Sequence, residues 1–263
     1  MPRPRPVVLL HGWTMRGAIF DDLIARLPTS FACYAPDLPG HGAVADREPS
    51  LKAAAETLAD LIKTQDLDDV LLVGWSMGAA VAWRFLEAFG TDRIAGLMTV
   101  DMSPKLGSRP DWPHGLIGQS EADLAATTER MIADWRGMSE AIATTMFASR
   151  EGATGYSRQA ALTQILANDP ARMIAMWRAM TAMDFRPLIA RIDRPVLAAS
   201  GARSRVYPAS AAQWLAATAP RGETHVFQAS GHSPHLEEPL AFADRLVEFA
   251  SSLRPGADDC VDA

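Results

Sequence analysis

The sequence lacks the features that mark several large classes of protein. Its 263 residues include only two cysteines, Cys33 and Cys260, and no C-x-x-C pair. This excludes a disulfide framework and fits a reducing compartment. A basic excess is also missing, because 31 acidic residues against 25 Lys and Arg give a net charge of −6. Nucleic acids and anionic membrane surfaces attract basic proteins, so we expect neither as a partner.

Long apolar runs are absent as well. The first residues, MPRPRP, lead into a short apolar run from Val7 to Leu10, which is too short for the core of a signal peptide. No other segment approaches the roughly 20 apolar residues that a membrane-spanning helix needs. We therefore expect a soluble, cytoplasmic protein.

The apolar residues that are present suffice for one large core. The chain is 48% hydrophobic and 21% charged, and a chain of this length can bury roughly three quarters of its unfolded surface. Short apolar strands alternate with helical patterns, which predicts a mostly parallel sheet with helices on both faces. Between residues 105 and 192 the pattern is helical without a clear strand. We expect a core over residues 1–104 and 193–254, a helical cap over 105–192 and a flexible tail over 255–263.

The most informative motif lies between Asp69 and Gly90. An apolar strand pattern over Val70–Val73 meets the pentapeptide GWSMG, and an Ala-rich helical pattern follows. A serine at such a strand-to-helix turn is held in a strained conformation with its hydroxyl exposed, and the flanking glycines allow the close approach of strand and helix. The context predicts that Ser76 is a nucleophile.

A serine hydroxyl needs an adjacent base, and histidine is the side chain best suited to that role at neutral pH. His232 follows the last expected strand and is the preferred candidate, with His235 as its rival. The other four histidines are expected in loops, in the insertion or at a strand edge: His11, His41, His114 and His225. For His41 and its neighbour Asp37 we favour a role in shaping the loop.

The strand over residues 6–10 ends in His11-Gly12-Trp13, at the edge of the sheet where ligands bind in open α/β folds. An oxyanion needs two fixed backbone donors, which the N–H groups of Trp13 and Met77 can supply. We expect Trp13, Trp75 and Met102 to contact the substrate. No residue pattern indicates a metal or a cofactor.

The insertion is rich in methionine. Met173, Met176, Met180 and Met183 follow three- and four-residue steps along one expected helix. Such a stripe normally packs onto the core, although methionine also suits an adaptable apolar pocket. Capping signals at Ser120-x-x-Asp123 and Asp169-Pro170 predict two helix starts. The arginines of the insertion are most simply a solvated face, and a docking surface for an acidic carrier is the alternative.

These segments together resemble the α/β-hydrolase family over essentially the whole chain. The matching pieces are HGW at 11–13, DLPGHG at 37–42, GWSMG at 74–78 and SGHSPHLEEP at 230–239. The resemblance implies an α/β-hydrolase fold with a helical cap inserted after the sixth strand, Ser76 as nucleophile and His232 as base. The start of the chain, with GWSMG, also resembles carboxylesterases that act on pimeloyl-carrier protein in biotin synthesis. This makes an acyl carrier protein a candidate partner.

The sequence departs from the family at the acid of the triad. The loop after the seventh strand, where most relatives carry an Asp, offers Ser204, and residues 201–222 contain no Asp or Glu. Asp101 ends the strand that follows the nucleophile helix, so we expect it to orient His232. The alternative is that Asp101 only caps its loop and that Ser204 or a water serves the histidine.

The function expected from these residues is hydrolysis of a carboxylic ester of a small to medium acyl group through an acyl-enzyme. A thioesterase or a C–C bond hydrolase would use the same triad. Dehalogenases and epoxide hydrolases of this fold need a carboxylate in place of Ser76, which excludes them. A non-catalytic binding protein of the same fold is the alternative outside enzymes.

Overall fold

The computed structural model describes residues 3–253, so the expected tail over 255–263, with Cys260, lies outside the described residues. Six strands form one sheet: β1 (Arg5–Leu10), β2 (Phe31–Tyr34), β3 (Val70–Trp75), β4 (Ile94–Val100), β5 (Val196–Gly201) and β6 (Gly222–Phe227). Their order is β2-β1-β3-β4-β5-β6, and every pairing is parallel. The carboxyl ends of all six strands therefore meet at one edge, where the ligand crevice of such sheets lies.

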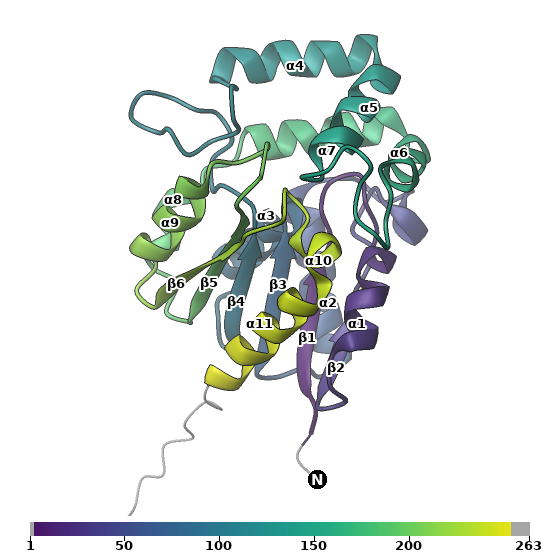
Figure 1. The fold of residues 1–263 in the computed structure, drawn as a ribbon. Helices are drawn as coiled ribbons and strands as arrows, with labels where there is room; N and C mark the ends of the chain where they lie inside the picture. The colour runs from purple at the N-terminus through teal and green to yellow at the C-terminus, as the bar shows by residue number, and fades with distance from the viewer. Residues whose placement is uncertain (1–2, 254–263) are drawn as a thin grey trace, which may run out of the picture.

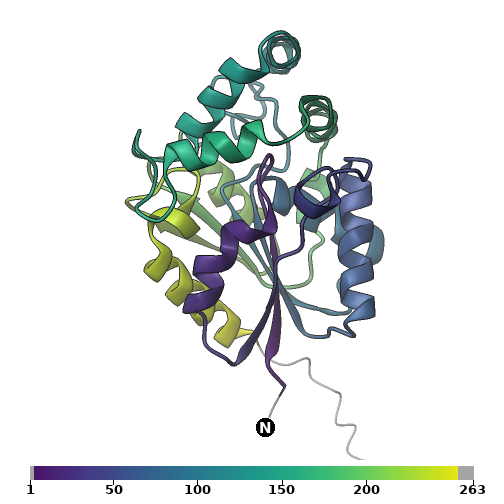
Figure 2. The ribbon, with the colours of Figure 1, turned by 90° about the vertical axis from the view of Figure 1, so that its right-hand side faces the viewer.

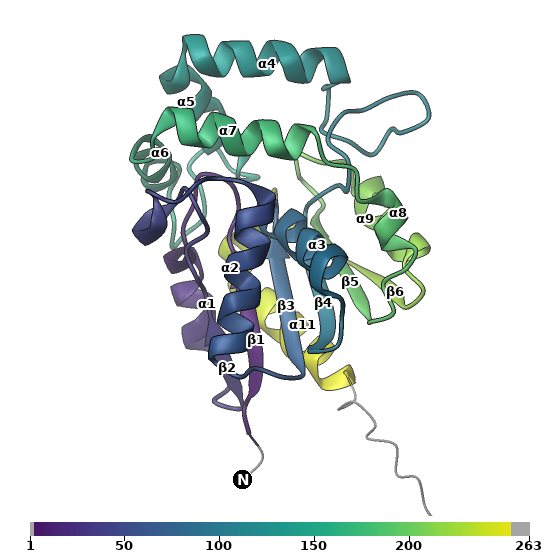
Figure 3. The same ribbon diagram turned by 180° about the vertical axis from the view of Figure 1, so that it is seen from behind.

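Helices cover both faces of the sheet, as the alternation predicted. One face carries α1 (Asp21–Arg26) and α11 (Pro239–Ser252), and the other carries α2 (Leu51–Thr64), α3 (Met77–Phe89) and α9 (Ala209–Thr218) (Figures 1 and 3). Alternate residues of β1 explain the two layers. Val8 and Leu10 join the core under α2 and α3, whereas Val7 and Leu9 join the core under α1 and α11.

Short helices lie in several loops that follow the carboxyl ends of the strands: η1 (Gly17–Phe20), η2 (Gly42–Val44) and α10 (Pro234–Glu237). Ser50 caps the start of α2, because its hydroxyl accepts the N–H of Ala53 at 3.0 Å. No pattern predicted α1 or α10, which are only six and four residues long.

The insertion lies over the carboxyl ends of the strands (Figures 1 and 2). It holds α4 (Glu121–Ala133), α5 (Trp135–Thr145), α6 (Arg158–Leu166), α7 (Pro170–Thr181) and α8 (Arg186–Ile189). It follows β4, the fourth strand in chain order within the described residues, where the resemblance to the family had implied a sixth. Within the described residues, every helix is too short or too polar to span a bilayer.

Two details of the insertion refine the sequence interpretation. The capping box of Ser120 and Asp123 begins α4, and the Asp169 side chain caps α7, as predicted. Residues 105–120, in contrast, are not helical. They form a loop held by backbone bonds such as Ser108 N–H to Gln119 O, 2.8 Å. Two prolines and three glycines in this stretch disfavour a helix.

Candidate active site

Ser76 lies at the turn between β3 and α3 with φ 52° and ψ −119°, a conformation that costs energy for any residue with a Cβ. The two flanking glycines make the turn possible. A Cβ at Gly78 would lie 2.0 Å from the carbonyl oxygen of Leu10, and one at Gly74 would lie 2.5 Å from the backbone nitrogen of Ala79. The fold therefore presents the serine hydroxyl at the carboxyl end of the central strand.

Asp101 and His232 are in direct contact. Nδ1 of His232 lies 2.6 Å from Oδ2 of Asp101, and the two side chains are 8% and 1% exposed. Asp101 comes directly after β4, has φ 48° and donates its backbone N–H to Ala199 O at 2.8 Å. The contact holds the imidazole with Nδ1 toward the carboxylate, which leaves Nε2 for a second partner.

Ser204 also contacts Asp101. Its hydroxyl donates to the same Oδ2 at 2.6 Å and accepts the N–H groups of Val206 and Tyr207 at 3.2 and 3.4 Å. The residue at the family's usual acid position is therefore bonded to the carboxylate and not to the imidazole. This arrangement differs from the alternative in which Ser204 serves His232 directly.

The N–H groups of Trp13 and Met77 have no hydrogen-bond partner within residues 3–253, as an oxyanion site requires. Two buried histidines fix the loop that carries Trp13. Nε2 of His11 accepts the N–H of Leu38 at 3.0 Å, and Nε2 of His41 accepts the N–H of Thr14 at 3.3 Å. Burial lowers the pKa of both, that of His11 to about 3, so both stay neutral and able to accept.

Asp37 shapes the neighbouring loop, as expected. Its two oxygens accept the N–H groups of Gly17 and Ala43 at 2.7 and 2.6 Å. His235, the rival base, is buried between Phe20 and Trp75, and neither ring nitrogen has a partner in the described part of the chain. Burial lowers the pKa of His235 to about 3. It does not line the pocket that contains Ser76.

Glu237 holds the loop of His232, a role that no pattern predicted. One oxygen accepts the N–H groups of Gly231 and Ser233 at 2.8 and 3.2 Å, and the other accepts that of Ala148 in the cap at 2.6 Å. Burial raises the pKa of this carboxyl against the lowering effect of these donors. The available signal was its position in the SGHSPHLEEP segment, where it is the last residue of α10.

Further bonds tie the cap to the same loop. The Ser233 hydroxyl donates to Met146 O at 2.9 Å, and Arg205 donates to the carbonyl of Phe147 at 2.7 Å. Trp75, at the end of β3, fixes the backbone of the histidine, because its Nε1 donates to His232 O at 2.8 Å. The end of α5, the histidine loop and the nucleophile strand therefore form one connected network.

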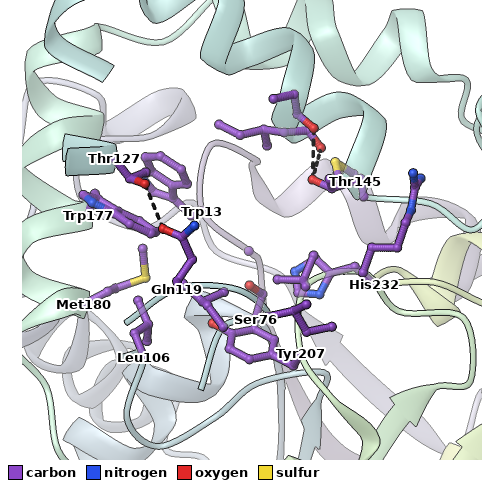
Figure 4. A pocket seen from close by; sticks show the side chains of 18 of the residues that line it. Trp13, Ser76, Leu106, Gln119, Thr127, Thr145, Trp177, Met180, Tyr207 and His232 are labelled. Atoms are coloured by element: carbon purple, nitrogen blue, oxygen red, sulfur yellow. Dashed lines mark hydrogen bonds between the residues drawn. The ribbon is translucent and has the colours of Figure 1, made fainter. Parts of the chain in front are cut away.

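A cavity of about 330 Å³ lies between the cap and the sheet edge, and Ser76 and His232 both line it (Figure 4). Its wall is mostly apolar: Trp13, Trp75, Leu106, Leu116, Met131, Met138, Ile142, Met146, Trp177 and Met180. The expected contacts of Trp13 and Trp75 are thus placed in the pocket. Met102, the third expected contact, is not among the residues that line this pocket, and its side chain is packed in the core.

The methionine stripe packs mainly onto the core; Met173, Met176 and Met180 lie on α7, and Met183 follows its end. All four residues are buried, and only Met180 lines the cavity. The other methionines of the wall come from α4, α5 and the residue that follows α5. Trp13 joins the cap to the core, because its Nε1 donates to Met173 O at 3.0 Å and its ring contacts Trp135 and Trp177.

Comparison with known proteins identifies the family and the fold. A profile described as "Alpha/beta hydrolase family" matches residues 7–245. A pimeloyl-[acyl-carrier protein] methyl ester esterase of Vibrio cholerae is 29% identical over 248 residues, which cover 93% of this chain and 94% of the relative. An esterase from Exiguobacterium antarcticum superposes with TM-score 0.86 at 23% identity, covering 96% of this chain and 94% of the other. A bromoperoxidase from Bacillus anthracis gives TM-score 0.84 at 20% identity, with 94% and 92% covered. The structural likenesses at this identity show the fold alone.

Proposed function

The chain belongs to the alpha/beta hydrolase family, and from this premise we propose that it is a carboxylic ester hydrolase with Ser76, His232 and Asp101 as its triad. The observation that carries the proposal is the 2.6 Å contact between His232 Nδ1 and Asp101 Oδ2, in a pocket that Ser76 also lines. The nearby curated relatives are named esterases, which supports an ester as the substrate class.

The proposed reaction begins with attack of Ser76 Oγ on the ester carbonyl carbon while His232 Nε2 accepts the hydroxyl proton. The oxyanion that forms accepts the N–H groups of Trp13 and Met77. His232 then gives its proton to the departing alkoxide, and an acyl group remains bonded to Ser76. A water, activated by the same histidine, releases the carboxylic acid and restores the serine.

Asp101 would hold the imidazole in the tautomer with a proton on Nδ1 and stabilise the imidazolium that forms during each transfer. Ser204 would hold the carboxylate. The unpaired N–H groups of Trp13 and Met77 would act without rearrangement, and one such donor typically lowers the barrier by about 3 kcal/mol.

Labelling with a fluorophosphonate probe tests the enzyme assignment directly. We expect one equivalent of label on Ser76 and loss of ester hydrolysis in proportion to labelling. A folded protein that takes no label would instead be a non-catalytic binding protein of this fold.

A substrate delivered on an acyl carrier protein is a second, narrower proposal. The curated relatives named above act, by name, on a carrier-bound methyl ester. Arg150, Arg158 and Arg205 line a surface groove beside the active-site pocket, and Arg205 borders both. Acidic side chains of a carrier would be attracted to these cations.

Hydrolysis of a methyl pimeloyl group on the carrier, compared with free dimethyl pimelate, tests this narrower proposal. We expect Arg150→Ala together with Arg158→Ala to raise KM for the carrier-bound ester and to leave the free ester unaffected. Equal effects on both substrates would contradict docking.

A further inference from the structure

One wall of the otherwise apolar pocket carries a chain of hydrogen bonds for which the hydrolysis chemistry has no use. Nη2 of Arg130 donates to Thr127 Oγ1 at 2.8 Å, and the Thr127 hydroxyl donates to Gln119 Oε1 at 2.8 Å. All three residues line the pocket. In Figure 4, Gln119 lies on the side of Ser76 that faces away from His232.

The network fixes which way the Gln119 amide points. A backbone carbonyl only accepts, so the amide atom that faces Gly118 O is Nε2, and Oε1 faces the Thr127 hydroxyl, which donates to it. On the other side of the amide, Nε2 donates to the carbonyl of Gly118 at 3.2 Å. One N–H of the Gln119 amide is therefore used, and the second has no partner among residues 3–253.

The backbone of Gln119 is fixed as well. Its carbonyl accepts the N–H of Ser108 at 2.8 Å, and its own N–H donates to Leu116 O at 3.1 Å. The next residue, Ser120, caps α4 through a complete capping box with Asp123. The amide is thus held in place before any ligand arrives, which lowers the entropic cost of a new hydrogen bond.

Tyr207 supplies a second donor. Its side chain is buried and lines the same pocket, and its phenol oxygen makes no hydrogen bond to the described residues. Burial, followed by the charge of Asp101, raises the pKa of the phenol, so the group stays protonated. Figure 4 shows its ring beside Ser76.

We propose that Gln119 and Tyr207 form a polar subsite that selects esters whose apolar chain carries an acceptor oxygen, such as a keto, ether or amide oxygen, away from the ester bond. Both groups offer N–H or O–H donors to a pocket whose other wall residues are mostly apolar. A plain hydrocarbon chain would cover these donors without offering an acceptor, which is costly, so the site disfavours such a chain. The inference rests on the proposed ester hydrolysis and adds the substrate class.

Matched pairs of esters test the subsite. Each pair consists of a straight-chain ester and an analogue in which one CH₂ is replaced by oxygen or a keto group, with the replacement moved along the chain. At one position we expect the analogue to be preferred about tenfold in kcat/KM, the size expected for one or two neutral hydrogen bonds.

Variants show whether the preference comes from these residues. Gln119→Met keeps the length of the side chain without its donor and should abolish the preference, and Tyr207→Phe should reduce it. Thr127→Val should reduce it through loss of the fixed amide orientation. Met131→Leu, on the same wall, is the matched control and should retain it. A Q119M enzyme with the wild-type ratio overturns the proposal.

Binding separates this inference from the proposed function. Ser76→Ala protein should bind the acceptor ester about tenfold more tightly than its plain partner in calorimetry, and the difference should vanish in the Ser76→Ala, Gln119→Met double variant. If wild-type protein hydrolyses no ester, the function fails while this comparison still tests the subsite. Equal binding of both esters to the Ser76→Ala protein overturns the subsite itself.

Discussion

Ser204 and His232 both contact the same oxygen of Asp101, and each contact is 2.6 Å long. The carboxylate is therefore held from the β5–α9 loop and contacts a histidine that follows β6. A donor of this kind stabilises the ionised carboxylate and restricts its rotation. The residue at the family's usual acid position thus bonds to the proposed acid, which follows another strand.

Replacement of Ser204 tests this support. A hydrogen bond to a charged group contributes more to stability than one between neutral groups. We expect kcat to fall about tenfold with little change in KM. Ser204→Thr retains the hydroxyl and should restore most of the rate. Wild-type kcat in S204A would show that the contact is dispensable.

Asp101→Asn should fold normally and lose about ten-thousandfold in kcat, because the amide cannot hold the required histidine tautomer. Circular dichroism and a thermal melt would control for folding. Near-normal hydrolysis by the folded variant would exclude Asp101 as the acid of the triad.

Ser76→Ala should retain less than about a hundredth of wild-type ester hydrolysis, since the covalent intermediate can no longer form. A p-nitrophenyl ester assay with freshly purified protein measures this loss. Ser230→Ala is a matched control, because Ser230 lies outside the pocket and bonds only to Glu238 through its side chain. A Ser76→Ala enzyme above that limit would require another nucleophile.

The size and polarity of the pocket predict the simple substrates. Short and medium acyl esters should be hydrolysed faster than esters with charged chains, because the apolar wall offers little to offset the desolvation of a charge. A chain-length series of p-nitrophenyl esters measures this, and EDTA should have no effect. Activity lost to EDTA and restored by zinc would contradict a serine mechanism without a metal.

His235 should limit stability in acid. Its pKa is lowered to about 3 in the folded protein, whereas an exposed histidine in the unfolded chain titrates near pH 6.5. The unfolded state therefore binds the proton first, and stability is present above about pH 6.5 and lost as the pH falls toward 3.

His235→Phe removes the group that binds a proton in the unfolded state. The phenyl ring also suits the aromatic surroundings of Phe20, Trp75 and Phe242. At pH 5 the gain should reach about 2 kcal/mol in the free energy of unfolding, and it should shrink by pH 8. Urea melts at the two pH values measure it. An equal gain at both would mean that the effect is one of packing alone.

The sequence was most informative where chemistry and backbone geometry coincide. The GWSMG segment predicted a strand, a turn and a helix, and the φ of 52° at Ser76 is the strain that such a turn implies. The position of Asp101 followed from the requirement that an acid reach the sheet edge where the histidine lies. Both are local consequences of where a strand ends.

What the sequence did not predict depends on side-chain packing or on contacts distant along the chain. Met102 is adjacent to Asp101, but its direction is set by core packing, which no motif encodes. Glu237 bonds to Ala148, 89 residues away. The partnership of Gln119, Thr127 and Arg130 required the exact course of the loop before α4, which has no periodic pattern.

Glu237, Ser233 and Arg205 bond to residues 146–148, so the two ends of the cap differ in how well they should tolerate substitution. The end of α5 is joined to the histidine, so a substitution there disturbs catalysis. α4 lies farthest from the sheet in Figure 1 and contributes wall residues without touching the triad. We therefore expect substitutions in α4 to change which substrates bind and to leave the catalytic rate largely unchanged.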